Sequence, residues 1–222
     1  MPLVHAAEVS SIVIAGSGGL GLELCDYLQS EAADGGPEVA GFIDDRPGAV
    51  PDGIALPYLG PIRPFRPAPH QAVLVAIGSP AARQAVLAWM LEHGIAVPSY
   101  IHGTALVSRA ATLGVGVLIF PFTVISRNAI VEDGVVTNVF CGIGHGSRVG
   151  ACSVLSPYAV LNGDTAIGPG CFLGTRATLY PGVKIGAECT VDSHTGVSSS
   201  TKDRQFITSG AYQITSRRIR EA

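Results

Sequence analysis

One residue that could act as an acid or base is His145, in the segment GIGH at residues 142–145. A neutral imidazole can take a proton from an attacking amine or hydroxyl group. Under the eighteen-residue stacking described below, its neighbours one coil away are Arg127 and Gly163, so the space beside it is open. The alternative is a surface histidine at a seam between copies of the chain. His194 is the other histidine within the repeat and the weaker candidate.

A second chemical signal is the glycine-rich stretch GSGGLG at residues 16–21, which follows the apolar run 11–15 and precedes a helical pattern. Strand, glycine turn and helix in this order predict an anionic ligand at the helix N-terminus. The next two strands are expected at 38–43 and 72–77. The domain is too short for the second half that would hold a nicotinamide, so a dinucleotide is not favoured.

Two acidic residues end the second predicted strand, and either could accept hydrogen bonds from a base or a sugar. A tight packing turn with a solvated acid pair is the alternative. The predicted contacts of this site are Gly16, Ser17, Gly18, Gly19, Asp44, Asp45 and Gly78.

The elements that position His145 follow from a period of six. In steps of six from Ile101 to Val197, sixteen of seventeen positions are aliphatic, and Thr137 is the exception. This period fits neither an amphipathic helix nor an alternating strand. It is the hexapeptide repeat of a parallel β-helix, in which three hexads make one triangular coil and residues eighteen apart stack. Glycines beside the corner residues are expected to permit the sharp bends between faces.

The predicted architecture is therefore a small doubly wound α/β domain followed by an all-β left-handed parallel β-helix. We divide the chain into residues 1–100 (Rossmann-like domain), 101–200 (β-helix) and 201–222 (C-terminal tail). The net charge of −3 does not suggest a nucleic-acid partner, and no apolar run approaches the length of a membrane span. The five cysteines show no metal or disulfide spacing, so we expect a cytoplasmic protein without a metal.

The chain resembles the bacterial sugar acyltransferases of the sialic acid O-acetyltransferase type, which include N-acetyltransferases of nucleotide-linked amino sugars. The resemblance extends from Ile12 to about Lys202. It rests on IVIAGSGGLG, GFIDD, LVAIGSPAAR, SYIHGTALVS, GVLIFPFTVIS, NVFCGIGHGSRVG and GPGCFLGTRATLYPGVKIG. It implies a homotrimer with acetyl-CoA between adjacent β-helices and the nucleotide in the N-terminal domain.

Site residues also follow from this resemblance. It makes His145 the catalytic base and Asn138 the active-site asparagine. The positions that match the lining of the acetyl-CoA groove are Gly163, Gly174, Thr175 and Lys202.

The sequence departs from the family in three places. Gly146 stands where an acid usually follows the histidine, Leu22 stands where the glycine turn usually continues with a basic residue, and the C-terminal CoA-contacting segment differs. The leading hypothesis is acetyl-CoA-dependent N-acetylation of a nucleotide-linked amino sugar in bacterial glycan biosynthesis. The alternatives are sugar O-acetylation of the sialic-acid type and a catalytically impaired protein that binds a nucleotide sugar.

Overall fold

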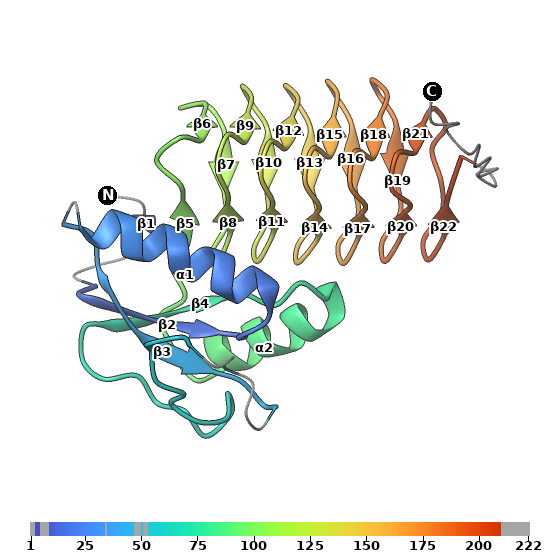
Figure 1. The fold of residues 1–222 in the computed structure, drawn as a ribbon. Helices are drawn as coiled ribbons and strands as arrows, with labels where there is room; N and C mark the ends of the chain where they lie inside the picture. The colour runs from blue at the N-terminus through green and yellow to red at the C-terminus, as the bar shows by residue number, and fades with distance from the viewer. Residues whose placement is uncertain (1–2, 5–8, 34, 47–49, 51–52, 210–222) are drawn as a thin grey trace, which may run out of the picture.

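The computed structural model describes the chain except for residues 1–2, 5–8, 34, 47–49, 51–52 and 210–222. A small α/β domain lies against one end of a long β-solenoid (Figure 1). The α/β domain is formed by the strands β2 (Ser11–Ala15), β3 (Glu38–Ile43) and β4 (Gln71–Val75) and by the helices α1 (Gly19–Ala32) and α2 (Pro80–Glu92).

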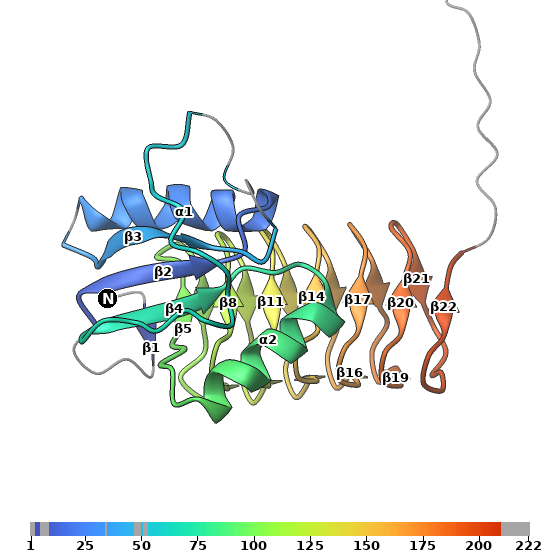
Figure 2. The same ribbon diagram turned by 90° about the horizontal axis from the view of Figure 1, so that it is seen from below.

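The three strands of this domain form a parallel sheet in the order β3-β2-β4. Helix α1 packs Leu24 and Leu28 against one face, in the cluster that contains Ile12 and Ile14 of β2. Helix α2 packs against the opposite face, in the cluster of Val13 and Ala15, and Figure 2 shows the sheet between the two helices. The side chains of β2 thus alternate between the two faces of the sheet and pack toward both helices, which confirms the predicted doubly wound arrangement.

The solenoid strands form three sheets along three faces. The first sheet runs β1 (Leu3–Val4), β5 (Ser99–Ile101), β8 (Leu118–Ile119), β11 (Val136–Thr137), β14 (Val154–Leu155), β17 (Phe172–Leu173), β20 (Thr190–Val191) and β22 (Phe206–Ile207). The second runs β6 (Leu106–Val107), β9 (Val124–Ile125), β12 (Gly142–Ile143), β15 (Val160–Leu161), β18 (Thr178–Leu179) and β21 (Gly196–Val197). The third runs β7 (Thr112–Leu113), β10 (Ile130–Val131), β13 (Arg148–Val149), β16 (Ala166–Ile167) and β19 (Lys184–Ile185).

Strand pairing follows the predicted eighteen-residue register. Thr137 pairs with Leu155, for example, and Ile143 pairs with Leu161, in parallel strands. The aliphatic columns fill the inside of the prism as one buried cluster. Thr137 fits this core because its hydroxyl donates to the backbone oxygen of Leu118 at 3.5 Å, which satisfies the polar atom there. The predicted parallel β-helix is confirmed, and the arrangement is consistent with the left-handed form.

The glycines that follow the aliphatic residues have a different role from the one predicted. A Cβ on Gly144 would lie 2.6 Å from the backbone carbon of Asn162 in the next coil, so a side chain there would collide with the neighbouring coil. The left-handed corners are instead built by other residues, including Phe122, Phe140 and Asp164, with φ values near +60°. These glycines therefore allow close stacking of coils rather than bending of the chain.

Both ends of the solenoid sheet extend beyond the repeat. β1 pairs antiparallel with β5, so Leu3 and Val4 join the solenoid rather than the α/β sheet. β22 pairs with β20 through Val191 and Ile207, which carries the last coil past residue 200. Within the described residues, neither helix has the length and apolar character that crossing a bilayer requires.

The two domains are joined by a buried arginine. Arg83 of α2 is fully buried. Its guanidinium donates to the backbone oxygens of Val75 in β4 and of Gly116 and Gly134 in the solenoid. Burial lowers the pKa of Arg83 to about 10, so the group remains charged at neutral pH. Leaving any of these carbonyls unpaired would cost about 1–3 kcal/mol, so the contact fixes the domains relative to each other.

Candidate active site

The glycine turn is held in place by backbone contacts. Gly16 has a φ of +105°, and a Cβ there would lie 2.6 Å from the backbone oxygen of Ala76, so no other residue fits without rearrangement. Helix α1 begins just after it, with Gly18 as N-cap and no side-chain cap. The first N–H groups of this helix therefore lack a side-chain acceptor and point toward the turn.

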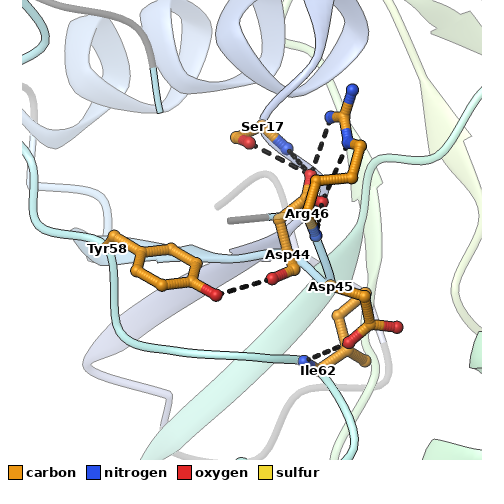
Figure 3. A network of polar contacts seen from close by, with 6 residues as sticks. All are labelled: Ser17, Asp44, Asp45, Arg46, Tyr58 and Ile62. Atoms are coloured by element: carbon orange, nitrogen blue, oxygen red, sulfur yellow. Dashed lines mark hydrogen bonds and ion pairs between the residues drawn. The ribbon is translucent and has the colours of Figure 1, made fainter. Parts of the chain in front are cut away.

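Asp44 at the end of β3 ties the turn to the sheet (Figure 3). Its carboxylate accepts hydrogen bonds from the backbone N–H and the hydroxyl of Ser17, each at 3.0 Å. It also accepts from the backbone N–H, Nε and Nη2 of Arg46, at 2.9, 3.0 and 2.9 Å. The hydrogen bond from the Arg46 side chain is the largest cause that holds the pKa of Asp44 well below its usual range, although burial opposes it. Both oxygens of Asp44 are thus occupied within the chain.

Asp45 is exposed and points away from the Arg46 guanidinium (Figure 3). One of its oxygens accepts from the backbone N–H of Ile62 at 2.9 Å. A cavity of about 440 Å³ lies between the turn and the N-terminal end of α2. Its lining contains six of the seven predicted nucleotide-site residues, and Ser17 is held behind it by Asp44: Gly16, Gly18, Gly19, Asp44, Asp45 and Gly78, together with Leu20, Arg46, Ile62, Ala76, Ile77, Ala82 and Val86.

His145 lies on the second solenoid sheet, just after β12. Its side chain is 71 % exposed, and its Nδ1 lies 4.0 Å from a carboxylate oxygen of Asp164, which is 74 % exposed. The ring borders a shallow hollow of about 320 Å³ on this face, which Ser126 and Asn162 also line. At 4.0 Å the contact is an electrostatic pairing rather than a hydrogen bond.

Two glycines shape the surroundings of the imidazole. A Cβ on Gly163 would lie 2.5 Å from Cε1 and 2.6 Å from Nε2 of His145, so the ring lies against the bare backbone of the next coil. A Cβ on Gly146, which has a φ of +66°, would overlap Oδ1 of Asp164. An acid at position 146 and the carboxylate of Asp164 would therefore compete for the same space.

The other predicted site residues lie elsewhere on the solenoid. Asn138 is half-buried at the neighbouring corner, and its side-chain oxygen accepts from the N–H of Val139 at 2.7 Å. Gly174 and Thr175 follow β17 at the same corner, two coils further along, and Lys202 is exposed in the last coil. Within one chain these residues do not line the hollow beside His145.

Aromatic side chains from three successive coils stack at the corner that follows Asn138. Phe122 and Phe140 stack with ring centroids 4.9 Å apart, and Phe140 and Tyr158 stack at 4.8 Å. The guanidinium of Arg176 continues the stack 4.8 Å from the Tyr158 ring centre. The three rings are 53 %, 42 % and 41 % exposed, so one chain leaves an apolar edge at the corner that precedes β12.

The sequence reasoning missed Arg46, Asp164 and Asn162. Arg46 follows the acid pair directly, and only the folded turn shows that its guanidinium returns to Asp44. Asp164 is eighteen residues after Gly146, so stacking the column of Gly146 would have placed an acid beside His145. Asn162 stacks on Gly144 in the same way, and its amide donates to the backbone oxygen of Leu179 at 2.7 Å.

Residues 11–90 match the family model of the PglD N-terminal domain. The chain is 28% identical over 109 residues to a GDP-perosamine N-acetyltransferase of Escherichia coli O157:H7, which is 49% of each chain. The alignment thus spans about half the length of that relative.

Two solved structures match over most of their length. PerB from Caulobacter crescentus, in complex with CoA and GDP-perosamine, is 28% identical, with a TM-score of 0.77 over 91% of this chain and 94% of that chain. The chain is a relative of the bacterial hexapeptide-repeat sugar acetyltransferases. The acetyltransferase domain of PglB from Neisseria gonorrhoeae FA1090 is 26% identical, with a TM-score of 0.78 over 86% of this chain and 93% of that chain. The family resemblance drawn from the sequence motifs is confirmed.

Proposed function

We propose that this protein transfers an acetyl group from acetyl-CoA to the amino group of a nucleotide-linked sugar. The observation that carries the proposal is the exposed imidazole of His145 beside the Asp164 carboxylate on an open face of a hexapeptide solenoid. Support comes from the relatives, because PerB is described in complex with CoA and GDP-perosamine. The glycan pathway served is proposed to be bacterial polysaccharide or glycoprotein synthesis.

His145 acts as the general base. With Nδ1 facing Asp164, the ring carries its hydrogen there and leaves Nε2 to accept a proton. The amine nitrogen attacks the thioester carbonyl, a C–N bond forms, the C–S bond breaks, and the amine proton moves to Nε2. The imidazolium then returns the proton to the departing thiolate. Asn138 positions the sugar or a bound water molecule in this scheme.

The transfer is direct, without an acyl-enzyme. The cysteine nearest in sequence to His145 is Cys141, whose side chain is buried in the prism core. Burial raises the pKa of the Cys141 thiol to about 12, and it raises that of Cys171 to about 11. Thiols are nucleophiles only when ionised, so neither is suited to carry the acetyl group. The five buried free cysteines also support a cytoplasmic location.

The two substrates are assigned to different parts of the chain. The nucleotide occupies the cavity beside the glycine turn, where Asp45 has an exposed carboxylate. Acetyl-CoA contacts Gly163, Gly174, Thr175 and Lys202 along the solenoid. Because Gly163 adjoins the imidazole while the other three lie at more distant coils, an extended cofactor would be needed to reach all four.

The active form is a homotrimer. Beside the aromatic edge at the corner that precedes β12, Leu106 and Val124 of the second sheet are 68 % and 42 % exposed, and Val124 lines the hollow at His145. A contiguous apolar surface next to an open hollow is typical of an interface. A second copy would enclose the hollow and bring its own corner residues to the histidine. Mass measurement in dilute solution tests this, and an active monomer would contradict it.

A thiol-release assay with acetyl-CoA tests the activity. GDP- and UDP-linked 4-amino sugars serve as acceptors, and the corresponding 4-hydroxy sugars and free sialic acid are the matched comparison. Thiol release that depends on the amino sugar, with an acetamido product by mass spectrometry, is the expected result. Release with hydroxyl acceptors alone would favour O-acetylation, and binding of nucleotide sugars without release would favour the impaired binding protein.

A further inference from the structure

The cavity beside the glycine turn has a basic end and an acidic end. At the basic end, Arg46 stands beside the turn, since a Cβ on Gly18 would lie 3.8 Å from its Nη2. At the acidic end, Asp45 is held by the N–H of Ile62 and points to the opposite side (Figure 3). Both side chains line the same cavity. Asp44, the first acid of the pair, lies between these two ends, and both of its carboxylate oxygens already accept hydrogen bonds within the chain.

Asp44 fixes Arg46 in this position. Nε of Arg46 donates to one oxygen of Asp44 and Nη2 donates to the other, which is a two-point pairing that orients a planar guanidinium. The Arg46 side chain is nonetheless 68 % exposed, and its Nη1 makes no hydrogen bond to the described part of the chain. An arginine that is held at one edge and open at the other is suited to bind a second anion.

The surroundings of Arg46 favour a phosphate group. The N-terminal end of α1, whose N-cap Gly18 offers no side-chain acceptor, lies at the same end of the cavity as the guanidinium. Helix N-terminal N–H groups carry partial positive charge, and they add to the charge of the arginine. The pairing of Asp44 with Arg46 and Ser17 compensates the negative charge that this acid would otherwise direct at the ligand.

We propose that Arg46 binds the diphosphate of the nucleotide sugar, and that Asp45, at the other end, accepts hydrogen bonds from the nucleoside. Asp44 is a positioning residue that acts through Arg46 and Ser17 and does not itself contact the ligand. Arg46 thereby takes the place of the basic residue that is absent at Leu22. This inference rests on the proposed function in assuming a nucleotide in the cavity.

Calorimetry without acetyl-CoA tests the proposal, with GDP, guanosine, UDP, uridine and inorganic pyrophosphate as probes. Arg46→Ala should weaken the binding of both diphosphates and of pyrophosphate by roughly tenfold to a hundredfold, and it should leave the nucleosides unchanged. Asp45→Asn should weaken the binding of the preferred nucleoside and of its diphosphate, while the binding of pyrophosphate stays the same. Arg46→Lys should restore part of the loss, because it keeps the charge without the planar pairing.

Arg66→Ala is the matched control, since Arg66 belongs to the same domain but donates to the backbone oxygens of Arg63 and Phe65 and stands over Trp89. It should bind all five probes like the unaltered protein. If Arg46→Ala lost affinity equally for nucleosides and diphosphates, or bound pyrophosphate as before, the inference would be overturned. So would an unaltered protein that binds none of the probes. Binding as expected without any acetyl transfer would leave this inference standing and contradict the proposed function instead.

Discussion

In the glycine cavity the carboxylate of Asp44 accepts five hydrogen bonds from Ser17 and Arg46, whereas on the solenoid face His145 and Asp164 are both more than 70 % exposed and 4.0 Å apart. In the first site, the hydrogen bonds of the acid are all supplied by the chain itself. In the second, the imidazole and its carboxylate lie on an open surface. This difference indicates that the cavity beside the glycine turn is preorganised in one chain. Under the proposed function, we expect the face that carries His145 to gain its enclosure from substrates or from another copy.

The largest effect is expected from the base itself. His145→Ala should lower kcat by roughly 10²–10⁴-fold, because it removes the group proposed to take the amine proton. The affinity for nucleoside diphosphates should stay unchanged, since the cavity is built without this residue. His194→Asn is the control, and asparagine tolerates the φ of +59° found at that corner. Full activity of His145→Ala in the thiol-release assay would refute the mechanism.

A smaller loss is expected when the imidazole is displaced rather than removed. Gly163→Ala puts a methyl group where the His145 ring lies, so the ring must move by about 1 Å, which typically costs about a hundredfold in rate. Gly103→Ala is the control, because a Cβ there meets no atom closer than 3.9 Å. Unchanged kcat in Gly163→Ala, with a stable fold by thermal unfolding, would show that the ring position is not fixed by this glycine.

Moving the carboxylate tests whether Asp164 orients the base. Asp164→Asn should lower kcat about tenfold, because the imidazolium formed during the reaction loses its counter-charge. Gly146→Asp alone should also be harmful, since the new side chain overlaps the Asp164 carboxylate. The double variant Gly146→Asp/Asp164→Gly should regain activity. If the double variant is worse than both single variants, Asp164 has a structural role only.

The smallest effect is expected when pH is lowered at the nucleotide cavity. The pKa of Asp44 is held well below its usual range, so its contribution is complete above the ordinary carboxyl value of about 3.9 and is lost only as pH falls through the lowered value. Nucleoside diphosphate affinity should therefore change little between pH 7 and pH 5. Calorimetry at the two pH values measures this, and a marked loss of affinity at pH 5 would contradict it.

Much of this arrangement could be predicted from the sequence, because the eighteen-residue register is a property of the period. The strand pairs of Ile143 and Leu161 follow from it directly. The stacking of Gly146 and Asp164 follows from the same rule. Whether the Asp164 side chain then faces the imidazole depends on its rotamer, which the period does not specify. Arg83 could not be predicted, because arginine is almost always exposed and its three carbonyl partners come from different parts of the chain. β22 lies outside the repeat because its coil is two residues shorter, as the pairing of Val191 with Ile207 shows.

The anchorage at Arg83 has a consequence for the length of the substrate. Because its carbonyl partners belong to Gly116 and Gly134, the α/β domain is fastened at one height on the solenoid, and His145 follows Gly134 by less than one coil. Each further coil would add about 4.8 Å along the axis. The distance between the anchored α/β domain and His145 can therefore change only in steps of one coil. Under the proposed function, inserting one set of eighteen residues between Gly134 and His145 should favour a sugar nucleotide of longer reach without altering either end.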